Sequence, residues 1–154
     1  MKGNQKLIEV LNDLLADELT AVNQYMVHAE MCESWGYEKL HKAIEKQAID
    51  EMHHAEWLIK RVLFLEGIPM VSKINKINIG KTVKDIINND QTAELDAVKA
   101  YNAAASLARE VSDQATVDLL AKILIMEEGH VDWAEVQQDQ IEQMGLENYL
   151  SNQS

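Results

Sequence analysis

Apolar residues recur three or four positions apart through most of this chain, which is the spacing of one face of an α-helix. The stripes predict four long helices, at about residues 4–33, 37–65, 82–111 and 113–144, and a short helix at about 146–153. Residues 66–81 carry no stripe, and Gly67-Ile68-Pro69 ends the second helix. The whole chain, residues 1–154, is therefore predicted to be one all-α domain, a four-helix bundle with one long crossover.

Each of the four stripes is interrupted by acidic or imidazole side chains where core residues are expected. The interrupting residues are Glu18 in the first stripe, Glu51 and His54 in the second, Glu94 in the third, and Glu127 and His130 in the fourth. Burying an ionised carboxylate costs several kcal/mol unless a partner compensates it. A bound cation is the compensation that suits this set.

The two halves of the chain match at a constant offset of 76 residues. The matched pairs are Glu18 with Glu94, Tyr25 with Tyr101, Glu51 with Glu127, His54 with His130 and Trp57 with Trp133. Oxygen and imidazole ligands without sulfur suit iron or manganese, and zinc can also bind them. Four carboxylates carry the charge that two divalent cations neutralise. We therefore expect a two-metal site in which Glu51 and Glu127 bridge the metals and Glu18 and Glu94 bind one each.

Tyr25 and Tyr101 follow the two terminal glutamates by two helical turns, on the same face. One reading is that both pack in the core with their hydroxyls bonded to a neighbour. The other is that at least one hydroxyl contacts a ligand carboxylate and supplies an electron or a proton. We expect such a contact for Tyr25 above all.

Several further residues favour structural readings. Trp57 and Trp133 are expected to pack or to lie in an interface. Gly129 either admits a close neighbour beside the imidazole or is merely tolerated in its helix. Three histidines lie off the stripes and are expected to be solvated, namely His28, His41 and His53.

Composition excludes several classes of protein. The net charge of −12 argues against binding to nucleic acid or to an anionic membrane. No run approaches the roughly 18 apolar residues of a membrane span. The first residues, Met1 to Lys6, lead into an amphipathic segment rather than a signal peptide. Cys32 is the single cysteine, which excludes an intrachain disulfide and indicates a reduced, cytoplasmic setting.

Short phrases along nearly the whole chain resemble those of the bacterioferritins, a family of ferritin-like di-iron proteins. They are Met1-Lys2-Gly3, Asp17-Glu18-Leu19, Asn23-Gln24-Tyr25, Ile49-Asp50-Glu51-Met52, Phe64-Leu65-Glu66-Gly67, Asn78-Ile79-Gly80, Glu127-Glu128-Gly129-His130 and Met144-Gly145-Leu146-Glu147-Asn148-Tyr149-Leu150. The resemblance implies the ferritin-like fold and a hollow shell of 24 subunits, built from dimers, that stores ferric mineral.

The resemblance also implies the activity and the cofactors. Each subunit would hold two iron ions in a ferroxidase centre, which oxidises Fe²⁺ with O₂ or H₂O₂. Its ligands would be Glu18, Glu51, His54, Glu94, Glu127 and His130. Met52 stands where the family's axial ligand binds a haem b shared by two subunits, and this haem would take electrons from a small ferredoxin to release iron.

The chain departs from the family pattern on the face turned to the cavity of the shell. Lys46 stands where some members carry a histidine, and Gln47 replaces a possible acidic neighbour. An accessory iron site on the inner wall is therefore not expected. Glu66, Asp132 and Asp139 are candidates for lining iron pores, but exposed acids are usually only solvated.

Other functions fit the sequence less well. A rubrerythrin-like peroxidase normally adds a cysteine-rich iron module, and this chain has one cysteine. A ribonucleotide-reductase-like radical role is disfavoured by the short chain. A shell subunit with a purely structural metal site would not need all six ligands. A miniature DNA-protecting ferritin places its ligands between subunits, whereas the repeat places them within one bundle.

Overall fold

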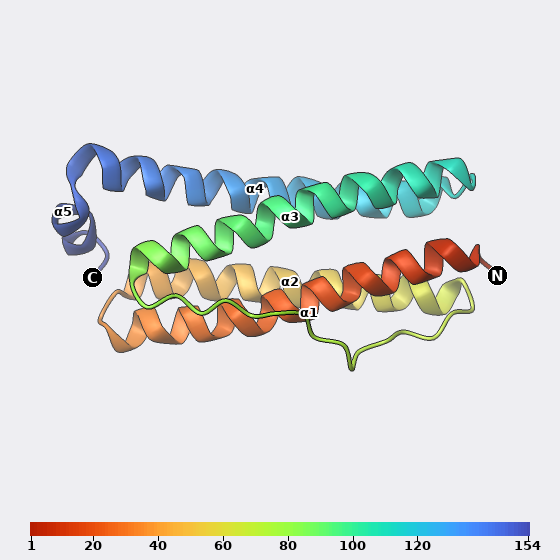
Figure 1. Ribbon diagram of the computed structural model, residues 1–154, viewed down its shortest axis with the longest axis horizontal. Coiled ribbons are helices and arrows are strands. Elements are labelled where there is room, and N and C mark those ends of the chain that lie inside the picture. Colours follow the sequence, from red (N-terminus) through yellow and green to blue (C-terminus); the bar gives the residue numbers. More distant parts are fainter.

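Four long helices run side by side along the molecule, and a fifth short helix lies at one end (Figure 1). The computed structural model describes residues 1–154. The elements are α1 (Gln5–Ser34), α2 (Glu38–Phe64), α3 (Val83–Glu110), α4 (Gln114–Met144) and α5 (Leu146–Ser151). The predicted all-α bundle with one long crossover and a short C-terminal helix is confirmed, and each bound lies within two residues of its prediction.

Local side-chain chemistry sets the helix ends. The side chains of Asn4, Thr82 and Asp113 accept hydrogen bonds from backbone N–H groups in the first turns of α1, α3 and α4. Gly145 ends α4 with a φ of 82°, a left-handed conformation that favours glycine. The chain can therefore turn sharply from α4 into α5.

The crossover between α2 and α3 is tied to one flank of α1. Three α1 side chains spaced one turn apart, Thr20, Gln24 and His28, accept hydrogen bonds from crossover N–H groups at 2.8, 3.0 and 2.9 Å. The donors are the backbone groups of Asn75, Asn78 and Gly80. Since these residues cover the flank, the crossover is an ordered part of the fold rather than a loose connection.

His28 and His41 are buried, so the prediction that both are solvated was wrong. The Nε2 atom of His28 accepts the Gly80 N–H, which leaves the proton on Nδ1 to donate to Asp90 Oδ1 at 2.8 Å. The Nδ1 atom of His41 lies 3.0 Å from the Ala29 carbonyl oxygen across the α1–α2 hairpin. Only His53 is exposed, as predicted.

Two apolar clusters fill the bundle. One gathers residues from the N-terminal half of α1, the C-terminal half of α2 and the ends of α3 and α4 that meet them, including Leu11, Leu58 and Leu120. The other lies toward the opposite end and includes Ile44 and Ile87. Along every long helix, the six interrupting glutamates and histidines fall between the two clusters.

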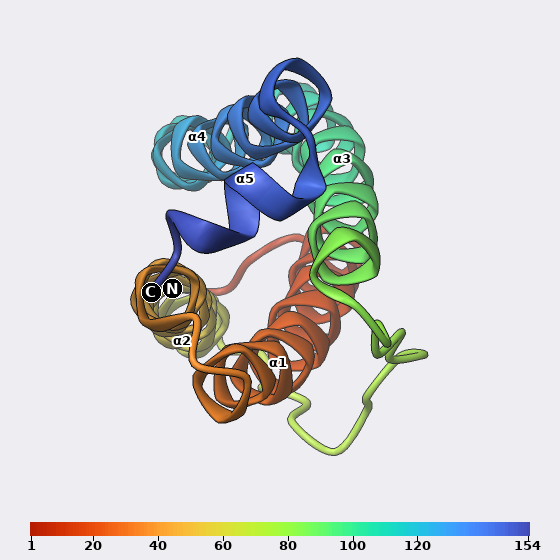
Figure 2. The ribbon, with the colours of Figure 1, turned by 90° about the vertical axis from the view of Figure 1, so that its left-hand side faces the viewer.

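Helix α5 covers one end of the bundle (Figure 2). The buried Tyr149 hydroxyl donates a hydrogen bond of 2.7 Å to Gln137 Oε1 on α4. The Lys39 N–H at the start of α2 donates to the Gln153 carbonyl oxygen at 2.9 Å. The C-terminal residues therefore bridge α4 and α2. None of the helices is apolar over a stretch that would cross a bilayer.

Candidate metal centre

Six acidic and imidazole side chains from four different helices meet in the middle of the bundle. Glu18 comes from α1, Glu51 and His54 from α2, Glu94 from α3, and Glu127 and His130 from α4. All six are buried, and the most exposed of them, His130, is 7% exposed. The structure thus brings together the entire set that the sequence selected, in a buried place where the charges need compensation from one another or from a cation.

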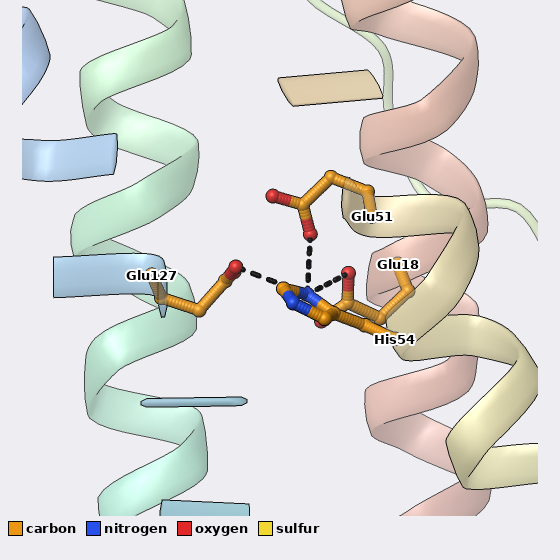
Figure 3. A group of neighbouring side chains, drawn as sticks. All are labelled: Glu18, Glu51, His54 and Glu127. Carbon is orange, nitrogen blue, oxygen red and sulfur yellow. Dashed lines mark hydrogen bonds and ion pairs between the residues drawn. The ribbon is translucent and has the colours of Figure 1, made fainter. Parts of the chain in front are cut away.

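His54 lies at the centre of the first group of ligand atoms (Figure 3). Its Nδ1 atom is 3.2 Å from Glu51 Oε2, 3.2 Å from Glu127 Oε1 and 3.5 Å from Glu18 Oε2. Glu127 reaches the imidazole from α4, on the side opposite α1 and α2. Three carboxylates therefore surround one nitrogen, an arrangement that a cation in their midst would stabilise.

His130 has the corresponding place in a second group. Its Nδ1 atom is 2.9 Å from Glu51 Oε1, 3.1 Å from Glu94 Oε1 and 3.7 Å from Glu127 Oε1. Within each group, one ligand atom per residue can be chosen so that all lie within 4.8 Å of one another. Glu51 and Glu127 belong to both groups, so the geometry allows each of them to bridge two cations.

The carboxylates have spare capacity to bind. One oxygen of each glutamate accepts no hydrogen bond, namely Glu18 Oε2, Glu51 Oε1, Glu94 Oε2 and Glu127 Oε1. The short contacts of three of these oxygens with imidazole nitrogens are ion-pair contacts without hydrogen-bond geometry. Buried carboxylate oxygens without a donor are rare because desolvation is costly. Two divalent cations fit this donor set in charge, in ligand type and in number of free oxygens.

The protonation states show how the site balances its charge without metal. Burial and the neighbouring Glu18 carboxylate raise the pKa of Glu127 to about 8. Burial, Glu18 and Glu94 together raise the pKa of Glu51 well above its usual value. Burial by itself would lower the pKa of His54, but the close Glu127 and Glu18 carboxylates outweigh burial and raise the pKa to about 9. In the metal-free site, protons bound to these side chains therefore offset the negative charge that cations would otherwise neutralise.

Both tyrosines of the repeat donate hydrogen bonds to site carboxylates. The Tyr25 hydroxyl donates to Glu94 Oε1 at 2.6 Å, and the Tyr101 hydroxyl donates to Glu18 Oε1 at 2.5 Å. Each tyrosine thus holds the glutamate of the opposite half of the chain. The contact was expected above all for Tyr25, and Tyr101 makes it as well, because the offset that pairs the tyrosines also pairs Glu18 with Glu94.

Sequence reasoning missed two residues that contact the far nitrogens of the imidazoles. Asp50 Oδ2 lies 3.0 Å from His130 Nε2, and Met126 Sδ lies 3.3 Å from His54 Nε2. Asp50 and Met126 immediately precede Glu51 and Glu127, and the offset of 76 residues that relates the two halves also relates them. Because the offset pairs an aspartate with a methionine, the comparison of identical residues that selected the six ligands could not identify them.

A cavity of about 200 Å³ leads from the carboxylates to the surface between α1, α3 and the crossover. Its inner wall includes all four site glutamates, and its lining also includes the exposed Asp17 and Asp96. The acids considered for pores, Glu66, Asp132 and Asp139, are exposed elsewhere and do not line this cavity.

The other singled-out residues do not belong to the two groups of ligand atoms. Met52 is 45% exposed, on the outer face of α1 and α2. Lys46 pairs with Asp50 at 3.2 Å, and Gln47 is buried. Nothing outside its own helix lies within 4 Å of a Cβ built at Gly129, so the close neighbour considered there is absent from this chain. The partly buried rings of Trp57 and Trp133 pack against the two apolar clusters.

Comparison with known proteins identifies the family to which this chain belongs. Residues 8–144 match the model of the ferritin-like domain. The chain is 40% identical to a bacterioferritin of Brucella melitensis over 97% of its length and 92% of the relative's. It is also 40% identical to a bacterial ferritin of Synechocystis, over 99% of both chains. A bacterioferritin of Rhodobacter capsulatus shares 38% identity over 97% of this chain and 92% of the relative. The chain therefore belongs to the ferritin-like proteins and, among them, to the bacterioferritin family.

Proposed function

We propose that this protein is a ferroxidase that binds two Fe²⁺ ions in its buried centre and oxidises them to Fe³⁺ with O₂ or H₂O₂. The observation that carries the proposal is the pair of overlapping ligand groups, which share Glu51 and Glu127 and in which one oxygen of every glutamate accepts no hydrogen bond. The substrate ions supply one electron each to the oxidant.

The side chains of the centre then have distinct tasks. Glu51 and Glu127 bridge the two cations, while Glu18 with His54 and Glu94 with His130 bind one cation each. Cation binding displaces the protons that Glu51, Glu127 and the imidazoles hold in the metal-free site, so binding strengthens as pH rises. The two tyrosine hydroxyls fix the orientation of Glu18 and Glu94, and they can supply a proton or an electron to the reaction.

Storage follows from family membership combined with the site. Relatives that align with nearly all of this chain are bacterioferritins. We therefore propose self-assembly of dimers into a hollow shell of 24 subunits that stores the ferric product as mineral. The exposed apolar side chains of the crossover, among them Ile68, Val71 and Ile74, suit contacts between subunits.

Met52 is proposed to bind haem b between two subunits, one haem per pair. The surface around it suits an apolar macrocycle with charged edge groups, because the pocket that Met52 lines is mostly apolar. Its other lining residues are Val22, Met26, Ala29, Ala48 and Ile49, together with Glu30 and Glu45. A thioether from each subunit would complete the axial coordination, and the haem would carry electrons from a small ferredoxin to stored ferric iron.

The test of the ferroxidase is aerobic Fe²⁺ addition to the metal-free assembly, followed by ferric absorbance. The wild-type protein should show a fast phase that saturates at about two irons per subunit, the capacity of a two-metal site. Glu127→Ala should abolish the fast phase while leaving the elution volume of the assembly unchanged. Glu51→Ala should do the same, because both residues bridge.

The matched control is Glu128→Ala, which removes a glutamate from the next position of α4 on the exposed surface. It makes the same change in charge without touching the centre, so its fast phase should match that of the wild-type protein. A normal fast phase in Glu127→Ala would rule out the bridging assignment. A small, colourless protein without a fast phase in the wild type would rule out the proposed function as a whole.

A further inference from the structure

The two imidazoles of the centre differ in what their outward nitrogens contact. Both rings turn Nδ1 toward the carboxylates. On the opposite side, His130 Nε2 lies 3.0 Å from a carboxylate oxygen of Asp50, whereas His54 Nε2 lies 3.3 Å from the thioether sulfur of Met126. The six ligands therefore obey the pseudo-twofold symmetry, but the residues that contact the outward nitrogens of the two imidazoles do not.

The internal repeat shows that this is a genuine break in symmetry. The offset of 76 residues relates Asp50 to Met126 and also relates Lys46 to Lys122. Lys46 Nζ lies 3.2 Å from Asp50 Oδ2. Lys122 has no acid one turn further along α4, and its Nζ lies instead over the Trp57 ring, 3.9 Å from the centroid. The Lys46–Asp50 pair that supports His130 thus has no counterpart at His54, whose outward nitrogen contacts a methionine instead.

The replacement changes the imidazole as a ligand. When Nδ1 binds a cation, the proton of the ring is on Nε2 and must be donated outward. A carboxylate acceptor makes the ring more basic and fixes its orientation, and losing such an acceptor typically costs 10- to 100-fold in metal affinity. A thioether is only a weak acceptor. His54 is completely buried, so solvent cannot replace the missing acceptor.

We propose that the two cation positions of this centre are unequal, with the position at Glu94 and His130 binding a divalent cation about 10- to 100-fold more tightly than the position at Glu18 and His54. The inference rests on the proposed two-metal centre and adds an order of filling to it. The Asp50-supported position fills first, and the Met126-supported position exchanges its cation more readily. Asp50 and Met126 are positioning residues, since they act through the imidazoles.

The test is anaerobic titration of the metal-free assembly with Co²⁺, followed by calorimetry and by the visible absorption of bound Co²⁺. Neither readout depends on iron oxidation. The wild-type protein should bind two Co²⁺ per subunit in two steps separated by 10- to 100-fold. Met126→Asp should strengthen only the weaker step and bring the two within a few-fold, because Lys122 lies one turn earlier to pair with the new carboxylate.

Two further variants make the assignment specific. Asp50→Leu should weaken the tighter step by 10- to 100-fold, so that its affinity falls to that of the weaker step. Met126→Leu keeps the apolar shape without adding a carboxylate, and it should preserve the separation. Two Co²⁺ ions that bind wild type with equal affinity, or a weaker step that does not move in Met126→Asp, would overturn the inference. Binding of fewer than two Co²⁺ per subunit would instead overturn the two-metal centre on which it rests.

Discussion

The Tyr101 hydroxyl on α3 donates a hydrogen bond of 2.5 Å to Glu18 Oε1 on α1. Tyr25 on α1 makes the reciprocal bond to Glu94 on α3. Each bond joins one helical hairpin to the other, and both tyrosines are 1% exposed. The two bonds therefore fix the spacing of α1 and α3 at the metal centre and leave the second oxygen of each glutamate free.

Replacing Tyr101 by phenylalanine should destabilise the metal-free protein. A buried hydrogen bond to a charged acceptor contributes about 1.5–3 kcal/mol, and Phe keeps the ring but removes the donor. We expect a loss of this size in the free energy of unfolding, measured as a lower urea midpoint. Tyr37→Phe is the control, because the partly exposed Tyr37 side chain makes no capping hydrogen bond at the start of α2 and loss of its hydroxyl should leave the midpoint nearly unchanged. Equal midpoints for Tyr101→Phe and wild type would contradict the prediction.

The stability of the metal-free protein should fall as pH rises from about 6.5 to 9. Burial alone would lower the pKa of His54 and of His130, but the close site carboxylates outweigh burial and raise both pKa values from 6.5 to about 9. Burial raises the pKa of Glu127 from 4.5 to about 8. Over this range the folded protein keeps protons that the unfolded chain has lost, and stability therefore declines with rising pH.

Metal should reverse this dependence. Two bound Zn²⁺ ions take over the role of the protons, and their affinity increases with pH because the ligands must lose protons to bind. Melting temperatures of the metal-free and Zn²⁺-loaded protein between pH 6 and 9 test both statements. We expect the melting temperature of the Zn²⁺-loaded protein to exceed that of the metal-free protein by a larger margin as pH rises. A metal-free melting temperature that does not change across this range would contradict the assigned protonation states.

Met52→Leu should yield a folded assembly without haem. Leucine preserves the apolar contacts in the pocket with Met26 and Ile49 but lacks the sulfur ligand. The measurement is the Soret absorbance per subunit of the purified assembly after reconstitution with haem. Met26→Leu serves as the matched control, since Met26 lines the same pocket on α1. An unchanged Soret band in Met52→Leu would place the haem ligand elsewhere.

His28→Ala should be costly although His28 is not one of the proposed ligands. The substitution leaves the buried Asp90 carboxylate without one donor and the Gly80 N–H without its acceptor. Leaving a buried polar group unpaired costs about 1–3 kcal/mol, and Asp90 keeps the hydrogen bond from Gln24, so we expect a total loss of roughly 2–4 kcal/mol in unfolding free energy. His53→Ala removes an exposed histidine and should change stability by less than about 0.5 kcal/mol. Similar losses in the two variants would argue that the crossover is not held by His28.

The sequence alone determined the helices, the crossover and the six residues of the centre. Helical periodicity places residues on a face relative to their own axis, and buried faces must be apolar unless something compensates the charge. Glu51 and His54 on one stripe, repeated as Glu127 and His130, therefore identify the site by their spacing alone. The offset of 76 residues between the two halves can be read from the sequence without knowing how the halves pack.

Only the tertiary structure decided what surrounds those faces. His28 lies off the apolar stripe of α1, but the crossover and Asp90 cover that flank and bury it. The inequality of His54 and His130 depends on which atoms meet their outward nitrogens across the bundle. The physical reason is the same in both cases. Periodicity is a property of one helix, whereas burial and hydrogen-bond partners come from chain segments far away in sequence, and their positions are set only when the bundle closes.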